Sequence, residues 1–307
     1  MSSAKPVIVV VAATGNQGSG VVDALLDSNK FVVRALSRSI ESNAAKALAA
    51  RGVEVVQADI YSPTDLEGAF KGAYGIFFTT LFEMMNKEPD HEVIQGKNVA
   101  DAAQKAGVKH IVFSTLPSLR DISGGKYTNA VIFDKKAEVT TYIKSLGLPA
   151  TYFIYGYFMT NTTRNPYSYR KVGVDSYELP TTNSVDVMMP VTDATGDAGC
   201  AVVKAFLNPT ETIGQEYLIA SGTLSLAEIA AEVARHTGKN VRAVRLSPEE
   251  AALHPFLRLP AIQEMNAAIA EFGYGPHLSL ESTIQTFGPE ITFSDFLARE
   301  KDVAFPE

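Results

Sequence analysis

A short glycine-containing turn near the beginning of the chain carries the residues with the clearest chemical use. It reads AATGNQG over positions 12–18, with alanine in place of the usual first glycine, and follows the strand-like apolar run Val7–Val11. Backbone N–H groups at a helix start bind phosphate, because the helix dipole leaves them partly positive. Gly15 would let the main chain approach a diphosphate, and Gly18 would let the helix pack on the strand. We therefore expect a dinucleotide site, rather than a mere tight turn, formed by Ala12, Thr14, Gly15, Asn16, Gln17 and Gly18.

A basic residue follows the second predicted strand. Domains that bind NAD(H) usually place a carboxylate there, where it holds the ribose 2′-hydroxyl. Here the strand ends in Ser37-Arg38, and a guanidinium binds phosphate through paired, charge-assisted hydrogen bonds. Ser37 and Arg38 therefore favour NADP(H) over NAD(H). Glu41 is close enough in the chain to pair with Arg38, which leaves a surface ion pair as the alternative interpretation.

Short β-branched runs alternate with helical segments over the first half of the chain. We expect strands at 7–11, 31–37, 53–57, 75–80, 110–115 and 150–154. Alternation with short connections produces right-handed βαβ units and a parallel sheet, so the predicted fold is a Rossmann-type, doubly wound α/β fold. Such sheets bind ligands beyond the carboxyl ends of their strands. The hydroxyl residues at two of these ends are candidates for binding as well as for ordinary capping: Thr79, Thr80, Ser114 and Thr115.

The regular alternation stops after Tyr155. Residues 166–183 are rich in Tyr, Ser, Thr and Pro, and helices are expected at 193–207, 225–237, 260–272 and 293–300. Ser225 and Glu228 form the pattern of a capping box at one helix start. We expect an NAD(P)-binding Rossmann domain over 1–155 and a smaller α/β lobe over 156–307, which would face a substrate or partner and intertwine with the first.

Composition narrows the class of protein. The 307 residues carry a formal net charge of −7, which argues against a nucleic-acid backbone as the main partner. The single cysteine, Cys200, cannot form an internal disulfide, fits a reducing, cytoplasmic compartment, and lies in an apolar run that predicts burial. The scattered histidines match no metal-binding pattern. We expect neither a signal peptide nor a membrane span.

Several further segments resemble the NmrA-like family, a branch of the atypical short-chain dehydrogenases. The resemblance rests on positions 12–18, 37–38, 57–59, 95–97, 133–139, 157–161 and 190–193, and so extends over nearly the whole chain. It is strongest to the redox-sensing members that bind NADPH, and weaker to the enzymes similar to isoflavone reductase.

This resemblance implies roles for residues that follow the predicted strands. Those implied to line the cofactor are Asp59 and Ile60 beside the adenine, Thr79, Thr80, Leu81 and Phe82 along the ribose and nicotinamide, and Ser114 and Thr115 beside the nicotinamide. Lys136 matches the lysine that reaches the nicotinamide ribose. Tyr155, Tyr157 and Phe158 would form the substrate side.

The chain departs from ordinary short-chain dehydrogenases at the catalytic tyrosine. Those enzymes use a Tyr-x-x-x-Lys pair in which the lysine lowers the tyrosine pKa. Counting back from Lys136, the tyrosine position is occupied by Ile132, which cannot transfer a proton.

Two functions remain open. One is an NADPH-dependent reductase of a small carbonyl, enone or quinone-like substrate, with Lys136, Tyr157 or water supplying the proton. The aromatic residues after the sixth strand favour this enzyme slightly. The other is a non-enzymatic NADP(H) redox sensor that acts through protein–protein binding, with a homodimer as one form of that binding. Direct DNA contact is the weakest alternative, because the chain is acidic and has no DNA-reading motif.

Overall fold

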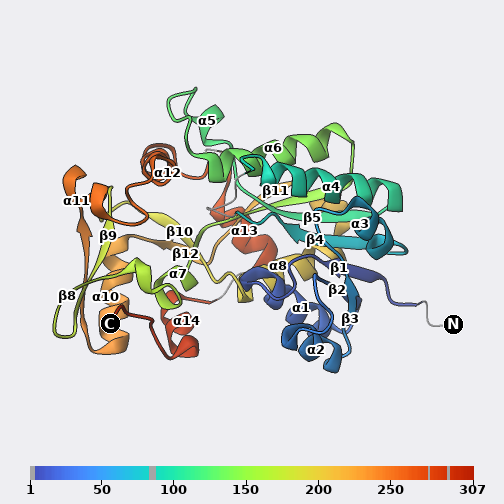
Figure 1. The fold of residues 1–307 in the computed structure, drawn as a ribbon, viewed down its shortest axis with the longest axis horizontal. Coiled ribbons are helices and arrows are strands. Elements are labelled where there is room, and N and C mark those ends of the chain that lie inside the picture. Colours follow the sequence, from blue (N-terminus) through green and yellow to red (C-terminus); the bar gives the residue numbers. More distant parts are fainter. Residues whose placement is uncertain (1–3, 83–87, 276, 289–290) are drawn as a thin grey trace. The chain divides into compact units, whose positions relative to one another are not determined.

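The chain forms two compact units that interleave along the sequence. The computed structural model (Figure 1) describes residues 4–82, 88–275, 277–288 and 291–307. The first unit contains Met1–Leu116, Lys135–Ile154 and Ala198–Tyr217, and the second contains Pro117–Asp134, Tyr155–Asp197 and Leu218–Glu307.

A seven-stranded sheet organises the first unit, in the order β11-β6-β5-β4-β1-β2-β3. Its strands are β1 (Val7–Val10), β2 (Val32–Ser37), β3 (Glu54–Gln57), β4 (Gly75–Thr79), β5 (His110–Thr115), β6 (Ala150–Tyr155) and β11 (Glu216–Ile219). Neighbours among β1 to β6 pair in parallel. The reversal of strand order between β1 and β4 is that of a doubly wound sheet, which confirms the predicted fold class. β11 comes from the second half of the sequence and was not predicted.

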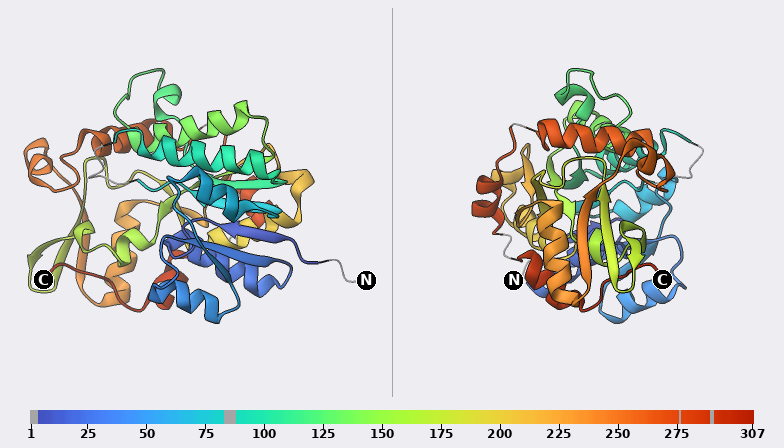
Figure 2. Two further views of the ribbon diagram at one scale, coloured as in Figure 1. Left: turned by 45° about the vertical axis from the view of Figure 1, so that its right-hand side comes forward. Right: turned by 90° about the vertical axis from the view of Figure 1, so that its left-hand side faces the viewer.

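Helices cover both faces of this sheet. They are α1 (Asn16–Ser28), α2 (Asn43–Ala50), α3 (Pro63–Phe70), α4 (His91–Ala106), α6 (Val131–Ser145), α8 (Gly196–Leu207) and α9 (Pro209–Thr212). Figures 1 and 2 show α3, α4 and α6 on one face and α1 and α8 on the other. Glycines allow close packing within each layer: a Cβ at Gly96 of α4 would lie 2.4 Å from Val139 of α6, and one at Gly199 of α8 would lie 2.3 Å from the Gly20 carbonyl of α1.

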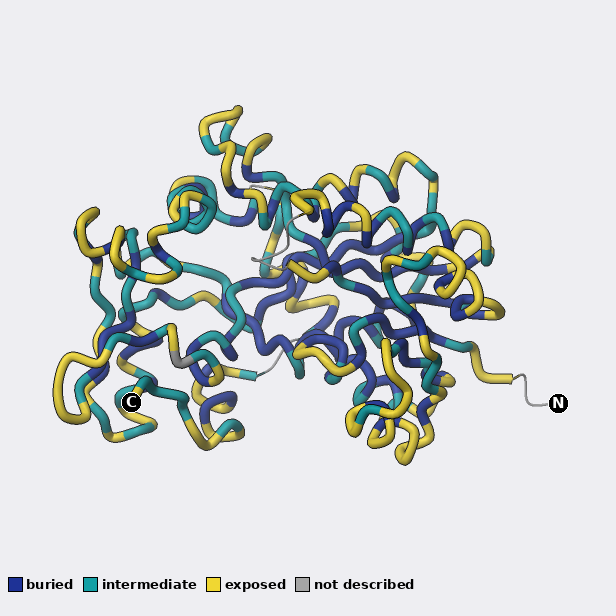
Figure 3. Tube along the Cα trace, viewed as in Figure 1, coloured by how far each residue is buried: buried dark blue, intermediate teal, exposed yellow. Residues whose placement is uncertain are grey.

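The central strands form the apolar core of the first unit, drawn dark blue in Figure 3. Every residue of β5 is buried, and Phe78 of β4 stacks on Phe113 of β5 with ring centroids 4.4 Å apart. A strand buried on both faces is mostly apolar, which is why the centres of these segments read as β-branched and aromatic runs.

The second unit contains two three-stranded sheets and several helices. One sheet has the order β12-β10-β7 and the other β13-β9-β8. The strands are β7 (Tyr157–Phe158), β8 (Arg170–Gly173), β9 (Ser176–Thr181), β10 (Met189–Thr192), β12 (Gly222–Leu224) and β13 (Asn240–Arg245). The helices are α5 (Leu119–Ile122), α7 (Thr160–Thr163), the 3-10 turn Pro166–Ser168, α10 (Leu226–Thr237), α11 (Pro248–Leu253), α12 (Pro260–Phe272), α13 (Leu280–Phe287) and α14 (Phe293–Glu300).

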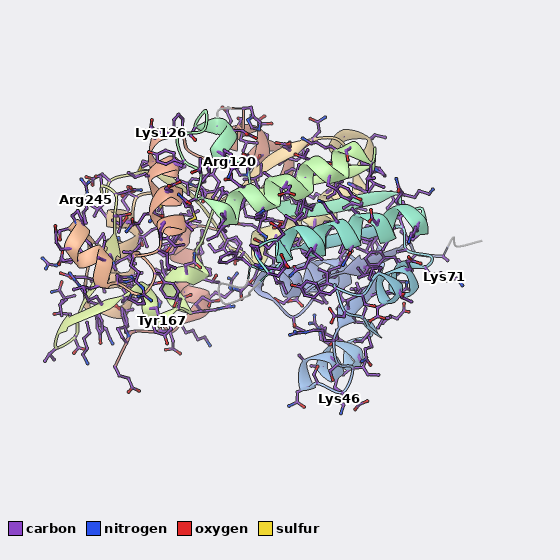
Figure 4. All side chains as sticks on the ribbon, turned by 45° about the horizontal axis from the view of Figure 1, so that its top comes forward. Lys46, Lys71, Arg120, Lys126, Tyr167 and Arg245 are labelled. Atoms are coloured by element: carbon purple, nitrogen blue, oxygen red, sulfur yellow. The ribbon has the colours of Figure 1, made fainter. Side chains whose placement is uncertain are left out.

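Local signals in the sequence explain several of these elements. The capping box predicted at Ser225 and Glu228 is present at the start of α10. Across the second sheet, Glu178 of β9 lies between Arg170 of β8 and Arg242 of β13 in the strand register. Burial opposes the charge of Glu178, but hydrogen bonds from Arg170 (2.8 Å) and Arg242 (2.6 Å) outweigh it and lower the carboxyl pKa. Exposed charged side chains, including Lys46 on α2 and Arg120 and Lys126 in the segment around α5, are shown in Figure 4.

The predicted burial of Cys200 is wrong. Its side chain is exposed, because α8 buries the face that carries Ala198, Ala201 and Ala205, and position 200 lies off that face. The short helix α5 and the helix α13 were also not predicted. None of the helices in the described parts of the chain combines the length and apolar character that crossing a bilayer requires.

Candidate cofactor site

The glycine turn links β1 to α1 and leaves the helix start suited to an anion. Gly15 is the N-cap of α1, has no side chain to cap the helix, and is followed by a first turn without acidic residues. The turn is closed by a hydrogen bond from the Gly15 N–H to the Ala12 carbonyl (2.9 Å), and Thr14, Gly15 and Asn16 are exposed. The helix dipole at this end is therefore not neutralised by a protein carboxylate on the helix itself.

Close packing explains why position 18 is a glycine, and the backbone of Ala12 in the same turn is strained. A Cβ at Gly18 would lie 2.1 Å from the Ala12 carbonyl oxygen, so only glycine fits, as expected from the sequence. Ala12 has a φ of 57°, in the left-handed region that disfavours a Cβ by about 1–2 kcal/mol. Glycine is the residue that this backbone position prefers, and alanine keeps the turn at a cost.

Gln17 provides a test of whether the site fits a cofactor. Its side chain is only 8% exposed, and its Oε1 accepts a hydrogen bond from Ser114 Oγ at 3.1 Å. Its Nε2 is buried and has no hydrogen-bond partner within the described residues. Buried amide donors are nearly always satisfied, so this donor is open to an acceptor on a bound molecule. The orphan donor, the Gly18 approach and the uncapped helix start together fit a bound dinucleotide.

Arg38 follows β2 and is exposed. The alternative pairing with Glu41 is not observed: Glu41 forms an ion pair with Lys46 at 2.9 Å, and Arg38 has no ion pair within the described chain. Ser37 Oγ donates to the Ser39 carbonyl at 2.8 Å, which shapes the turn that carries Arg38. The guanidinium is thus free to bind a phosphate group.

The ends of β3, β4 and β5 hold the other predicted cofactor residues. Thr79 of β4 pairs in register with Ser114 of β5, so these two ends are adjacent. Thr115 Oγ1 bonds Thr140 Oγ1 at 2.8 Å and the Lys136 carbonyl at 3.2 Å, which ties β5 to α6. Asp59 instead accepts the Tyr61 N–H at 2.9 Å and so shapes the turn after β3. Leu81 and Phe82 are exposed.

Lys136 lies in a buried network that was not predicted. Its Nζ donates to Glu92 Oε1 (2.7 Å), Thr80 Oγ1 (2.7 Å) and the Thr80 carbonyl (2.8 Å). An ammonium has three hydrogens, so these contacts use all of its donors. Burial lowers the pKa of Lys136, and the Glu92 carboxylate opposes that shift. Adjacent Lys135 is the more exposed of the two lysines and pairs with Asp90 and Glu138.

One sequence signal points to this network in retrospect. Glu92 and Gln95 are fully or nearly fully buried polar residues three positions apart in α4, on the face that otherwise carries Val99, Ala102 and Ala103. Polar residues within the apolar stripe of a helix need buried partners. The spacing marks the two side chains, but their partners are distant in the sequence.

The predicted aromatic residues belong to the second unit. Tyr155 is buried, and its ring lies edge-on to Phe158 with centroids 6.4 Å apart. Burial raises the pKa of Tyr157 to about 12, against a hydrogen bond with Asn161 that lowers it. Tyr157 therefore keeps its proton at neutral pH and differs from a tyrosine that a neighbouring lysine activates as a base.

Comparison with known proteins identifies the family. A model described as the NmrA-like family matches residues 4–297. An NmrA-like oxidoreductase named FrzB, from Cladobotryum sp., is 32% identical over 77% of this chain and 75% of its own length. The negative transcriptional regulator NmrA in complex with NADP superposes with a TM-score of 0.71 at 25% identity, over 89% of this chain and 83% of NmrA. An Escherichia coli NADPH-dependent quinone oxidoreductase, complexed with NADPH, shares the fold with a TM-score of 0.73 at 21% identity, over 95% and 99% of the two chains. The chain belongs to the NmrA-like family.

Proposed function

We propose that the first unit binds NADP(H) and that the protein is an NADPH-dependent reductase of a small carbonyl, enone or quinone-like substrate. The observation that carries the cofactor assignment is the turn at residues 12–18, with its buried, unpartnered Gln17 Nε2 and its glycine-only approach at Gly18. Arg38, free of ion pairs in the described chain, supports the phosphorylated nucleotide. The family's oxidoreductases and the NADP complex of NmrA support the same assignment.

The protein's own groups would bind and orient the cofactor and would help to protonate the reduced substrate. The uncapped α1 start would hold the diphosphate, Gln17 would donate to it or to a neighbouring oxygen, and Arg38 would bind the 2′-phosphate. When bound, the nicotinamide would supply a hydride to an electrophilic carbon of the substrate, and the product would need one proton. Tyr157, which is protonated at neutral pH, and water are better sources than Lys136, whose three hydrogens are engaged.

The test begins with binding. Calorimetric titration with NADPH, NADP⁺ and NADH should show a preference for the phosphorylated nucleotides. NADPH oxidation is then followed over a panel of quinones, enones and small carbonyl compounds, with Tyr157→Phe as the variant. No uptake of any nicotinamide nucleotide by folded protein would contradict the cofactor assignment, and uptake without turnover on any substrate would contradict the reductase.

A second function is favoured by one observation. Ile132 occupies the position of the usual catalytic tyrosine, and the similar protein NmrA is a transcriptional regulator. A redox sensor would bind a partner protein or a second copy differently in its NADP⁺, NADPH and empty states. Light scattering and partner capture in the three states test this role, and identical behaviour in all three would exclude it. The lone Cys200 is compatible with a cytoplasmic location for either function.

A further inference from the structure

The buried pair of Lys136 and Glu92 suggests a role for a lysine that has no free donor. We propose that the two side chains form a clamp that fixes the main chain at Thr80, and that both are positioning residues of the cofactor site rather than catalytic residues. The inference rests on the proposed function, because it assumes that Thr80 and Leu81 line the bound cofactor.

The clamp holds Thr80 at two atoms. Lys136 Nζ donates to its carbonyl oxygen at 2.8 Å and to its hydroxyl at 2.7 Å, and that hydroxyl donates to Glu92 Oε1 at 2.8 Å. Thr80 directly follows β4 and is 3% exposed. Because one of the two atoms belongs to the backbone, the contact fixes the path of the chain as it leaves the sheet. Helices α4 and α6 therefore both hold the end of β4, α4 through Glu92 and α6 through Lys136.

A second side chain of α4 holds the next residue of the main chain after Thr80. Gln95, three positions after Glu92 in α4, accepts the Leu81 N–H at 2.8 Å and donates to the Tyr61 hydroxyl at 2.7 Å. One helical turn thus holds two successive residues after β4 and also reaches the turn after β3. Leu81 remains 45% exposed although its backbone is held, so its side chain is available to a ligand.

Electrostatics explains why the clamp needs both members. The Lys136 and Glu92 side chains are 11% and 2% exposed, and Glu92 Oε2 has no hydrogen-bond partner within the described residues. Removing one member therefore leaves a buried charge without its counter-ion, which is far more costly than removing both. If the pair only positions Thr80, a neutral pair that keeps a donor for the Thr80 carbonyl and an acceptor for the Thr80 hydroxyl should restore most of its effect. If Lys136 contacts the cofactor or the reacting atoms, no change at position 92 can replace it.

The experiment compares Lys136→Gln, Glu92→Gln and the double variant, with Lys135→Gln as the matched control on the same helix. The amide that replaces Lys136 keeps an N–H donor for the Thr80 carbonyl, and the amide that replaces Glu92 keeps an acceptor for the Thr80 hydroxyl. We expect each single variant to weaken NADPH binding by about tenfold or more, as for a lost charge-assisted hydrogen bond. The double variant should return to within about fivefold of the wild type, and Lys135→Gln should bind like the wild type. Fluorescence titration with NADPH measures all five proteins.

The outcomes separate the clamp from the cofactor assignment. A folded double variant that binds as weakly as Lys136→Gln overturns the clamp, as does a double variant that fails to fold. If the single variants do not fold, the double variant alone decides. If wild type and Lys135→Gln both bind no NADPH, the proposed function is wrong. The clamp is then judged by thermal unfolding, where a double variant whose Tm loss equals the sum of the two single losses would refute the coupling.

Discussion

Acid should destabilise this protein through one buried histidine. His110 begins β5 and is fully buried. Its Nε2 lies 2.8 Å from Thr151 Oγ1, and Thr151 donates its own hydroxyl hydrogen to the Thr212 carbonyl at 2.8 Å. Nε2 must therefore carry the proton and donate to Thr151. Burial lowers the pKa of His110 from 6.5 to about 4, so the ring is neutral in the folded protein at pH 7.

The sign and size of the effect follow from proton linkage. Between pH 6.5 and pH 4 the unfolded chain binds a proton at this histidine and the folded chain does not. The contribution is fully present above pH 6.5 and is lost as the pH falls toward 4. The two pKa values differ by about 2.5, and at about 1.4 kcal/mol for each whole pH unit the loss reaches about 3 kcal/mol.

Urea denaturation at pH values from 8 to 4 measures this loss. The matched variant is His110→Gln, whose amide N–H can replace Nε2 as a donor to Thr151 but does not titrate. We expect the variant to be less stable than the wild type at pH 8 and to lose less stability on acidification, by about 3 kcal/mol. Parallel curves for the two proteins between pH 6.5 and pH 4 would refute the assignment of the acid sensitivity to His110.

Three further predictions concern the cofactor turn and the residue after β2. Gly18→Ala should abolish NADPH binding and lower the free energy of unfolding by about 1–3 kcal/mol, because its Cβ would lie 2.1 Å from the Ala12 carbonyl oxygen. The control is Gly68→Ala, whose Cβ would have nothing within 4 Å, and equal effects of the two variants in calorimetry and thermal melts would contradict the packing argument. Ala12→Gly should relieve its φ of 57° and stabilise the fold by up to about 1 kcal/mol after the entropy of glycine is subtracted, and a lower Tm would show that the strain is absent. Arg38→Ala should weaken NADPH binding by about tenfold or more and leave NADH binding unchanged, whereas the control Lys46→Ala should change the binding of neither nucleotide. If Arg38→Ala weakened the binding of both nucleotides equally, Arg38 would not bind the 2′-phosphate.

Apolar runs in the sequence were enough to predict β1 to β6 of the seven-stranded sheet. The runs at β1, β4 and β5 are continuous and apolar because both of their faces are buried, and that constraint is local to each strand. Helix starts were predictable for the same reason, since a cap such as Ser225 with Glu228 acts within four residues. Strands in the second half of the sequence, such as β11 and β12, were not predicted, because no regular alternation of strands and helices marks them there.

The chemical identity of the candidate site was determined by the sequence, and its geometry by the tertiary structure. Residues 12–18 and Arg38 indicate a nucleotide because their residue types suit phosphate at the ends of neighbouring strands. The partner of Lys136 could not be inferred from the sequence, because Glu92 is 44 positions away and faces it only after α4 and α6 pack together. The unpartnered donor of Gln17, the strain at Ala12 and the exposed face of Cys200 likewise depend on which atoms the fold brings near. A local sequence pattern indicates which helix or strand a segment can form. Which side chains are buried, which form ion pairs and which polar atoms lack a hydrogen-bond partner is decided only when segments distant in the sequence pack together and exclude water.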